Sequence, residues 1–262
     1  MTSSDLDPKP SHVQSVSRAL SIVELLAKEN REMTLTEISQ CMGWPKSTTY
    51  GLLVTLRDYH YVSQSPVNGR YTLGVRLFEL GNTVARSWNI RSLAYPFMQQ
   101  LYNRWGETIH LAAEFDGEVL YLEKLESNRP IRIVSEVGVR LPMHVSSLGK
   151  AILAFKTASE VRWILSQHGM QALTSRTITD SGQMDRELER VREQGYAEDI
   201  GETMDSLRCV AVPIRNSEGR VSNAISISGI DYAISDELLT RIVSDLQKAA
   251  EEISYAIGYR KA

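Results

Sequence analysis

The order of hydrophobic periods in the first third of the chain limits its fold most strongly. Apolar residues recur every three or four positions at 16–26, 35–42 and 45–56, which predicts three helices. Thr34 opens the second helix, because the glutamate three residues on completes a capping box. Gly43 ends that helix, so the third helix follows after a short turn.

A β-hairpin follows the third helix. The sequence alternates with a period of two at 61–64 and 70–73. Between these strands lies Pro66-Val67-Asn68-Gly69, whose Asn-Gly pair is the strongest short signal for a hairpin turn. Three helices followed by a hairpin predict a winged helix-turn-helix domain over residues 12–74, with the helix-turn-helix itself at 35–54.

The remaining residues predict a second and larger domain, as a length of 262 residues permits. The helical period returns at 75–90, where we expect a helix that connects the two domains. Residues 91–262 mix hairpins with helices, which is typical of an α+β domain with an antiparallel sheet. Residues 1–11 are polar, hold two prolines and predict a disordered tail. The expected strands are 108–115, 119–125, 131–134, 208–214 and 221–230, and the expected helices are 93–105, 146–155, 159–167, 184–194 and 236–256.

Charge and composition exclude several classes of protein. Lys and Arg number 29 against 32 Asp and Glu, and the net charge of −3 argues against a protein that coats nucleic acid, although it permits one small DNA-reading domain. Cys41 and Cys209 form no CxxC pair, which disfavours a disulfide framework and a cysteine-rich zinc site. No signal peptide and no apolar run of about 18 residues occurs, so we expect a cytoplasmic protein with no membrane partner.

The third helix would enter the major groove of double-stranded DNA with its first residues. Those residues combine short hydrogen-bonding side chains with a cation and an aromatic ring, a mixture that suits phosphates and base edges. Further candidates lie later on this helix and at the wing. The expected DNA contacts are Lys46, Ser47, Thr48, Thr49, Tyr50, Arg57, Asn68 and Arg70. A helical module that binds another protein remains the alternative interpretation.

The predicted DNA-binding domain has little net charge. Six Lys or Arg residues stand against five Asp or Glu residues between His12 and Gly74. Because phosphate contacts dominate affinity, we expect a monomer to bind DNA weakly. A homodimer would double the basic contacts and would match a palindromic operator.

Specific motifs occur in both halves of the chain. They are Ser15-Val16-Ser17-Arg18-Ala19-Leu20, Leu35-Thr36-Glu37-Ile38, Pro45-Lys46-Ser47-Thr48-Thr49-Tyr50 and Tyr71-Thr72-Leu73-Gly74 in the first half, and Leu141-Pro142-Met143-His144, Gly149-Lys150-Ala151, Leu207-Arg208-Cys209-Val210-Ala211 and Ala224-Ile225-Ser226-Ile227-Ser228-Gly229 in the second. Together they resemble the IclR family of bacterial transcriptional regulators over about residues 12–258. The resemblance implies a GAF-like C-terminal domain that binds an effector, and homodimers that often pair into tetramers.

The resemblance also implies where the effector binds. In family members that sense small acids, ligand oxygens meet backbone N–H groups just before Gly-Lys-Ala, here at Ser147 and Leu148, where a helix N-terminus favours an anion. The other matching positions are Asp199, Cys209, Ser226 and Ser228. The two serines lie two residues apart on one predicted strand, so their hydroxyls share a face.

Leu148 departs from the pattern of the family's acetate-operon repressors, which have smaller residues at 147–148. A leucine would narrow the pocket and add apolar contact, which implies an aromatic or longer acid rather than glyoxylate or pyruvate. Structural interpretations stay open for the same residues. Cys209 would then be a core residue, and Asp199 would belong to a solvated acidic loop.

The sequence carries none of the common catalytic motifs that would indicate an enzyme. His, Cys, Asp and Ser all occur in the second half, but no GxSxG, HExxH or GxxxxGK[ST] pattern is present, and Cys209 lies inside an apolar strand. We therefore expect no catalytic residue, no metal and no cofactor. The expected function is a ligand-responsive regulator that represses a catabolic operon. A ligand sensor whose helical module binds protein is the alternative, although such an adaptor would not need the wing.

Overall fold

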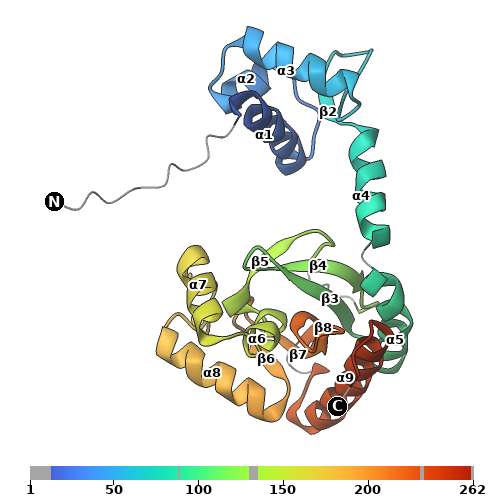
Figure 1. The fold of residues 1–262 in the computed structure, drawn as a ribbon, viewed down its shortest axis with the longest axis vertical. Helices are drawn as coiled ribbons and strands as arrows, with labels where there is room; N and C mark the ends of the chain where they lie inside the picture. The colour runs from blue at the N-terminus through green and yellow to red at the C-terminus, as the bar shows by residue number, and fades with distance from the viewer. Residues whose placement is uncertain (1–12, 88, 130–134, 231–232, 261–262) are drawn as a thin grey trace, which may run out of the picture. The chain divides into compact units, whose positions relative to one another are not determined.

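The computed structural model describes residues 13–87, 89–129, 135–230 and 233–260 (Figure 1). Contacts between residues divide the chain into two units, Met1–Trp88 and Asn89–Ala262, and each is described by itself. The tail expected at 1–11 and the strand expected at 131–134 lie outside the described residues.

The first unit consists of helices around a small apolar core, with a two-stranded wing. Its elements are α1 (Gln14–Glu29), α2 (Leu35–Met42), α3 (Lys46–Asp58), β1 (Val62–Gln64), β2 (Tyr71–Leu73) and α4 (Val75–Ser87). This is the order that the hydrophobic periods predict. The buried residues of its core are Ile22, Leu26, Met33, Ile38, Leu53, Leu56, Val62 and Tyr71.

Local hydrogen bonds fix the start of α2 and the position of the wing. The Thr34 hydroxyl oxygen accepts a bond from the Glu37 N–H, and the Glu37 carboxylate accepts one from the Thr34 N–H at 2.7 Å, which completes the capping box. The wing strands pair antiparallel, and Tyr71 exchanges two backbone hydrogen bonds with Met33. Pro45 lies immediately before α3, so this helix begins one residue later than the expected range 45–56.

In the described residues, a six-stranded antiparallel sheet forms the centre of the second unit. Its elements are α5 (Asn89–Trp105), β3 (Thr108–Phe115), β4 (Glu118–Leu125), β5 (Arg140–Pro142), the 3₁₀ turn η1 (Met143–Val145), α6 (Ser147–Leu153), α7 (Ala158–His168), α8 (Ser181–Gln194), β6 (Ala197–Ile200), β7 (Leu207–Arg215), β8 (Val221–Ile230) and α9 (Asp236–Ala256). The strands lie in the order β5-β4-β3-β8-β7-β6. The two expected hairpins, β3–β4 and β7–β8, are present, and pairing of β3 with β8 joins them into one sheet.

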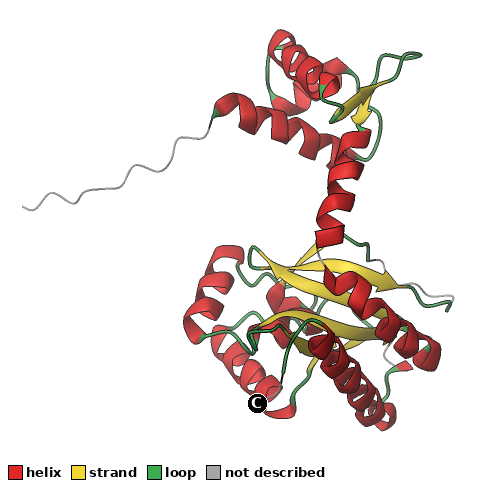
Figure 2. Cartoon of the chain, turned by 45° about the vertical axis from the view of Figure 1, so that its right-hand side comes forward, coloured by secondary structure: helices red, strands yellow, loops and turns green. Residues whose placement is uncertain are grey.

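Helices cover both faces of this sheet (Figures 1 and 2). On one face α6 packs against β7 and β8, where small side chains such as Ala151, Ala211 and Ala224 allow a close approach. On the other face α9 packs against β7 and also against α5. The predicted α+β fold, with an N-terminal winged helix-turn-helix and a C-terminal antiparallel sheet, is confirmed.

The differences from the sequence prediction are local. Strands β5 and β6 have three and four residues, which is too short for alternation to be recognised. Helix α5 begins at Asn89 rather than Leu93, and α8 begins at Ser181 rather than Met184. No helix in the described part of the chain is both long enough and apolar enough to cross a membrane.

Candidate DNA-binding surface and effector site

The first turns of α3 present polar side chains to solvent. Lys46, Ser47 and Tyr50 are exposed, and Thr48 is half-buried. These side chains cover the outer face of the helix at its N-terminal end, which is the end that reads base edges in helix-turn-helix proteins. Hydroxyl, ammonium and phenol groups can each bond to a base edge or a phosphate.

Thr49 does not belong to this surface, and the expectation that it contacts DNA is wrong. Its side chain is fully buried, and its hydroxyl donates to the Pro45 carbonyl oxygen at 3.2 Å. Thr49 shares a helix face with Leu53 and Leu56, which lie in the core. That spacing was present in the sequence and is sufficient to assign Thr49 to the core.

The polar residues of the wing hold it against the first helices. Arg70 donates to the Glu32 carbonyl oxygen at 3.3 Å and lies 3.5 Å from a Glu37 carboxylate oxygen. The Asn68 amide donates to the Glu32 carboxylate at 2.9 Å. Asn68 is exposed and 39% of the Arg70 side chain is exposed, so both can still meet a phosphate at the edge of the wing.

Arg57 links α3 to the wing. Its guanidinium donates to the Gln64 side-chain oxygen at 3.3 Å and pairs with Asp58 at 3.3 Å. Because 41% of the Arg57 side chain is exposed, the same guanidinium can also face the DNA backbone.

The predicted effector residues of the strands converge on one face of the sheet. Asp199 of β6 pairs with Cys209 of β7, and Cys209 pairs with Ser228 of β8, so the three form a row across neighbouring strands. Ser226 lies two residues before Ser228 and points to the same side. All four side chains are buried. Ala211 pairs with Ser226 and packs beneath α6, which places the group on the α6 side of the sheet.

Ser147 and Leu148 form the first turn of α6. Ser146 caps this helix, because its hydroxyl oxygen accepts a bond from the Gly149 N–H at 3.0 Å. The first N–H groups of a helix have no carbonyl partner within it, so those of Ser147 and Leu148 point out of its N-terminal end. A β-carbon at position 149 would collide with the Met143 carbonyl oxygen, which explains the glycine.

Asp199 is buried and hydrogen-bonded, so its interpretation as part of a solvated acidic loop is wrong. One carboxylate oxygen accepts a bond from the Glu202 N–H at 2.7 Å, and the other accepts one from the Thr203 hydroxyl at 2.6 Å. Burial raises the pKa of Asp199, and these hydrogen bonds oppose the shift. Asp199 therefore fixes the turn that follows β6.

A buried ion pair ties α6 to that turn. The Lys150 side chain is 1% exposed, and its ammonium lies 2.5 Å from the Glu202 carboxylate and 3.4 Å from that of Glu187 on α8. Burial raises the pKa of Glu202, and the charge of Lys150 opposes the shift. These three charges connect the helix that begins at Ser147 to the turn that holds Asp199.

Sequence reasoning missed His110, which lies beside the two serines. It pairs with Ser226 across β3 and β8, and its Nδ1 lies 3.4 Å from the Ser228 hydroxyl. Its Nε2 lies 2.8 Å from the Ser135 hydroxyl, and its ring centroid is 4.8 Å from that of Tyr121. The available signal was a histidine among the apolar residues at 109–113 of a predicted strand.

His110, Cys209 and Tyr121 are uncharged at pH 7. Burial, and then the positive charge of Lys124, lowers the pKa of His110 to about 3. Burial raises the pKa of the Cys209 thiol and of the Tyr121 hydroxyl. A neutral imidazole offers one donor and one acceptor nitrogen, so this part of the sheet can hydrogen-bond to a ligand without adding charge.

Two family models match the chain. The model described as the IclR helix-turn-helix domain matches residues 15–66. The model described as the C-terminal domain of the bacterial transcriptional regulator IclR matches residues 82–255. The two matches correspond to the winged helix-turn-helix unit and to the unit built on the sheet.

Similar proteins are transcriptional regulators. The HTH-type transcriptional regulator XynR of Escherichia coli K12 is 37% identical over 94% of this chain and 98% of its own length. The transcriptional repressor IclR of the same organism is 32% identical over 96% of this chain and 92% of its own length. A crystal structure of an IclR homologue from Microbacterium hydrocarbonoxydans, complexed with 4-hydroxybenzoate, is 26% identical, with a TM-score of 0.82 over 93% of this chain and 98% of that one. Sequence, fold and matches agree that this chain belongs to the IclR family of bacterial transcriptional regulators and is a DNA-binding regulator, not an enzyme.

Proposed function

We propose that this protein is a repressor that binds a palindromic operator as a dimer and responds to a small organic acid. The observation that carries the proposal is a cluster of buried polar groups on the face of the sheet that lies under α6. They belong to His110, Cys209, Ser226 and Ser228. Two relatives support it, since one is named a transcriptional repressor and the other is complexed with 4-hydroxybenzoate. Its DNA target implies that the protein acts in the cytoplasm.

The effector that fits this cluster is a carboxylate with an aromatic or longer apolar body. The N–H groups of Ser147 and Leu148 would receive the carboxylate, because charge-assisted hydrogen bonds are roughly twice as strong as neutral ones. His110 and the serine hydroxyls would bond to a second polar group of the ligand. The buried side chains of Leu148 and Tyr121 would contact its apolar body.

The operator would be read by the exposed face of α3. Lys46, Ser47, Thr48 and Tyr50 would contact base edges and the adjacent phosphates. Arg57, Asn68 and Arg70 already make hydrogen bonds or ion pairs within the protein but are still partly exposed. They would contact the DNA backbone beside the major groove. The wing is the feature that favours this reading over a module that binds protein.

A dimer would form through the apolar surface of α1 and α4. Val16 and Leu20 of α1 and Val75 and Phe78 of α4 have side chains that are 56–70% exposed, and we call these four residues together the N-terminal apolar face. A groove of about 460 Å³, lined by residues of α1, α3 and α4, adjoins it. Covering such a surface with a second copy is favourable by about 25 cal/mol per Å² of apolar area. Two dimers would pair into the tetramer that the family resemblance implies.

The operator test uses a DNA fragment selected by the protein from random sequence. Thr48→Ala should weaken binding of that fragment roughly tenfold or more in fluorescence anisotropy, because a base-edge contact is lost. Thr49→Ala is the control: its hydroxyl is buried, so folded Thr49→Ala should bind the fragment like the wild type. Failure to select any specific DNA would favour the protein-binding alternative.

The effector test screens aromatic and aliphatic acids, 4-hydroxybenzoate and benzoate included, for release of the selected operator. Ser226→Leu should abolish the response to any acid that acts on the wild type, because the larger side chain would occupy the place proposed for the ligand between the sheet and α6. Ser217→Leu, in the exposed turn after β7, should respond normally. A Ser226→Leu protein that responds at wild-type concentrations would place the effector elsewhere.

A further inference from the structure

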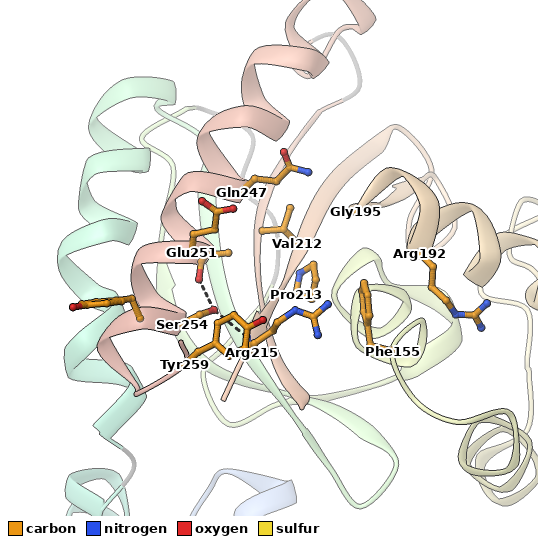
Figure 3. Close-up of a pocket in the computed structure, with 12 residues that line it drawn as sticks. Phe155, Arg192, Gly195, Val212, Pro213, Arg215, Gln247, Glu251, Ser254 and Tyr259 are labelled. Atoms are coloured by element: carbon orange, nitrogen blue, oxygen red, sulfur yellow. Dashed lines mark hydrogen bonds between the residues drawn. The ribbon is translucent and has the colours of Figure 1, made fainter. Parts of the chain in front are cut away.

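A pocket of about 570 Å³ lies on the second unit, apart from the proposed effector residues (Figure 3). Its walls come from the end of β7, from α9, from the end of α8 and from the segment after α6. None of the six predicted effector residues is among those that line it. Its volume is within the range of small-molecule sites, roughly 300–1,000 Å³.

The pocket opens at an edge of the sheet. Strand β6 pairs with β7 only along Arg208–Ala211, so within the described chain the residues from Val212 to Arg215 pair with β8 alone. This edge is protected against strand addition, since Pro213 has no N–H and the Arg215 N–H donates to the Ser254 hydroxyl at 3.0 Å. An occupant must therefore be held by side chains.

Arg215 supplies a fixed cation in the pocket wall. Its guanidinium carbon lies 4.8 Å from the centroid of the Phe155 ring, towards which it points in Figure 3, and one of its nitrogens donates to the Gly219 carbonyl oxygen at 3.1 Å. No carboxylate of the described residues lies within 4.0 Å of it. A guanidinium has five N–H donors, so several stay available for a ligand. The other arginine of the lining, Arg192, is already paired with Glu189.

We propose that this pocket binds a small monocarboxylate with a flat apolar body. The planar Arg215 guanidinium suits a carboxylate, which it can hold through two parallel hydrogen bonds. Val212, Pro213 and the Phe155 ring would cover the body of the ligand. Glu251 lies on the α9 wall (Figure 3), and its negative charge would repel a second carboxylate on the ligand.

The test is isothermal titration calorimetry of the full chain carrying Ser226→Leu, which closes the proposed effector site. Benzoate is the probe, and benzamide is the uncharged molecule of the same shape. We expect one benzoate per chain, in about the millimolar range typical of so small a ligand, and binding of benzamide weaker by roughly tenfold or more. Adding Arg215→Gln should weaken benzoate binding by a similar factor. Adding Arg220→Gln, at an exposed arginine in the next turn, should leave it unchanged.

Three results would overturn the proposal. They are equal benzoate affinity in the Arg215→Gln and Arg220→Gln proteins, equal affinity for benzoate and benzamide, and no benzoate binding in the Ser226→Leu background. Cys209→Phe replaces Ser226→Leu if that variant does not fold. The proposed function is tested separately in a protein that carries Arg215→Gln but keeps Ser226. In this protein we measure whether the acid found in the screen still releases the selected operator.

Discussion

At the level of single residues, burial decides the chemistry of the sheet face under α6, where the proposed effector residues lie. Charged forms are costly away from water, so His110 and Cys209 stay neutral there. Asp199 lies in the same row as Cys209 and Ser228; burial raises its pKa, and its hydrogen bonds to the turn after β6 oppose that rise. A ligand that reaches this face therefore meets hydroxyl, thiol and imidazole groups more than charges.

We expect His110 to make the stability of the second unit depend on pH. Its pKa is about 3 in the folded protein, well below the ordinary value of 6.5. Between these values the unfolded state binds a proton that the folded state does not, so stability is lost as pH falls below about 6.5. From pH 7 to pH 5 the wild type should lose up to about 2 kcal/mol more than His110→Asn in urea unfolding.

His168→Asn controls for removal of a histidine as such, because His168 is exposed at the end of α7. It should keep the pH dependence of the wild type. The same pH dependence in wild type and His110→Asn would mean that the imidazole is not held uncharged in the fold.

Thr49 and His110 show what the sequence can decide about a residue. The burial of Thr49 follows from its helical spacing to Leu53, so local information suffices. The place of His110 depends on a contact with Ser228, 118 residues away in the chain. No local pattern reports such a pairing, because the alternation within a strand says which residues share a face but not which strand lies beside it.

At the level of elements, charge as well as apolar packing holds α6 in place. Lys150 joins α6 to α8 through Glu187 and to the turn after β6 through Glu202. One Glu202 carboxylate oxygen is buried with no hydrogen-bond partner in the described structure, so the ammonium is the main group that offsets its charge. The position of Ser147 and Leu148 at the start of α6, where we propose that the effector binds, depends on this arrangement.

Lys150→Met should destabilise the second unit strongly. Removing one partner of a buried ion pair leaves an uncompensated charge, which costs about 3–5 kcal/mol. Urea unfolding measures the loss, and Lys248→Met, at an exposed lysine of α9, should cost far less. Adding Glu202→Gln to Lys150→Met should restore part of the stability, because this second substitution removes the unpaired buried carboxylate. If Lys150→Met unfolds at the wild-type urea concentration, the pair does not hold α6.

Elements differ in how far the sequence defines them. The hairpins β3–β4 and β7–β8 are predictable, because the turns Asp116-Gly117 and Asn216–Gly219 interrupt long alternating runs. Strands β5 and β6 carry too few residues for a period to be seen. Asp199 lies on β6, which the sequence pattern does not predict. Family motifs could therefore name Asp199, Cys209 and Ser228, but the sequence could not place all three side by side.

At the level of the whole molecule, charge and exposed apolar side chains both support the proposed dimer. The chain carries a net charge of −3, and its DNA-binding domain has only one more basic than acidic residue. The electrostatic attraction between one winged helix-turn-helix domain and DNA is therefore weak. Two such domains are needed for a tight and specific complex. The N-terminal apolar face gives the surface on which two copies would meet.

Phe78→Glu should therefore separate the dimer and weaken operator binding. Phe78 is 70% exposed on α4, and a carboxylate there would be buried unpaired against the second copy, which is costly. Sedimentation velocity should show a lighter species than the wild type. Affinity for the selected operator should fall roughly tenfold or more at about 0.1 M salt, because half of the phosphate contacts are lost. Val67→Glu, at a residue of the wing that is 92% exposed, should sediment like the wild type. A Phe78→Glu protein with the mass and operator affinity of the wild type would place the dimer contact on another surface.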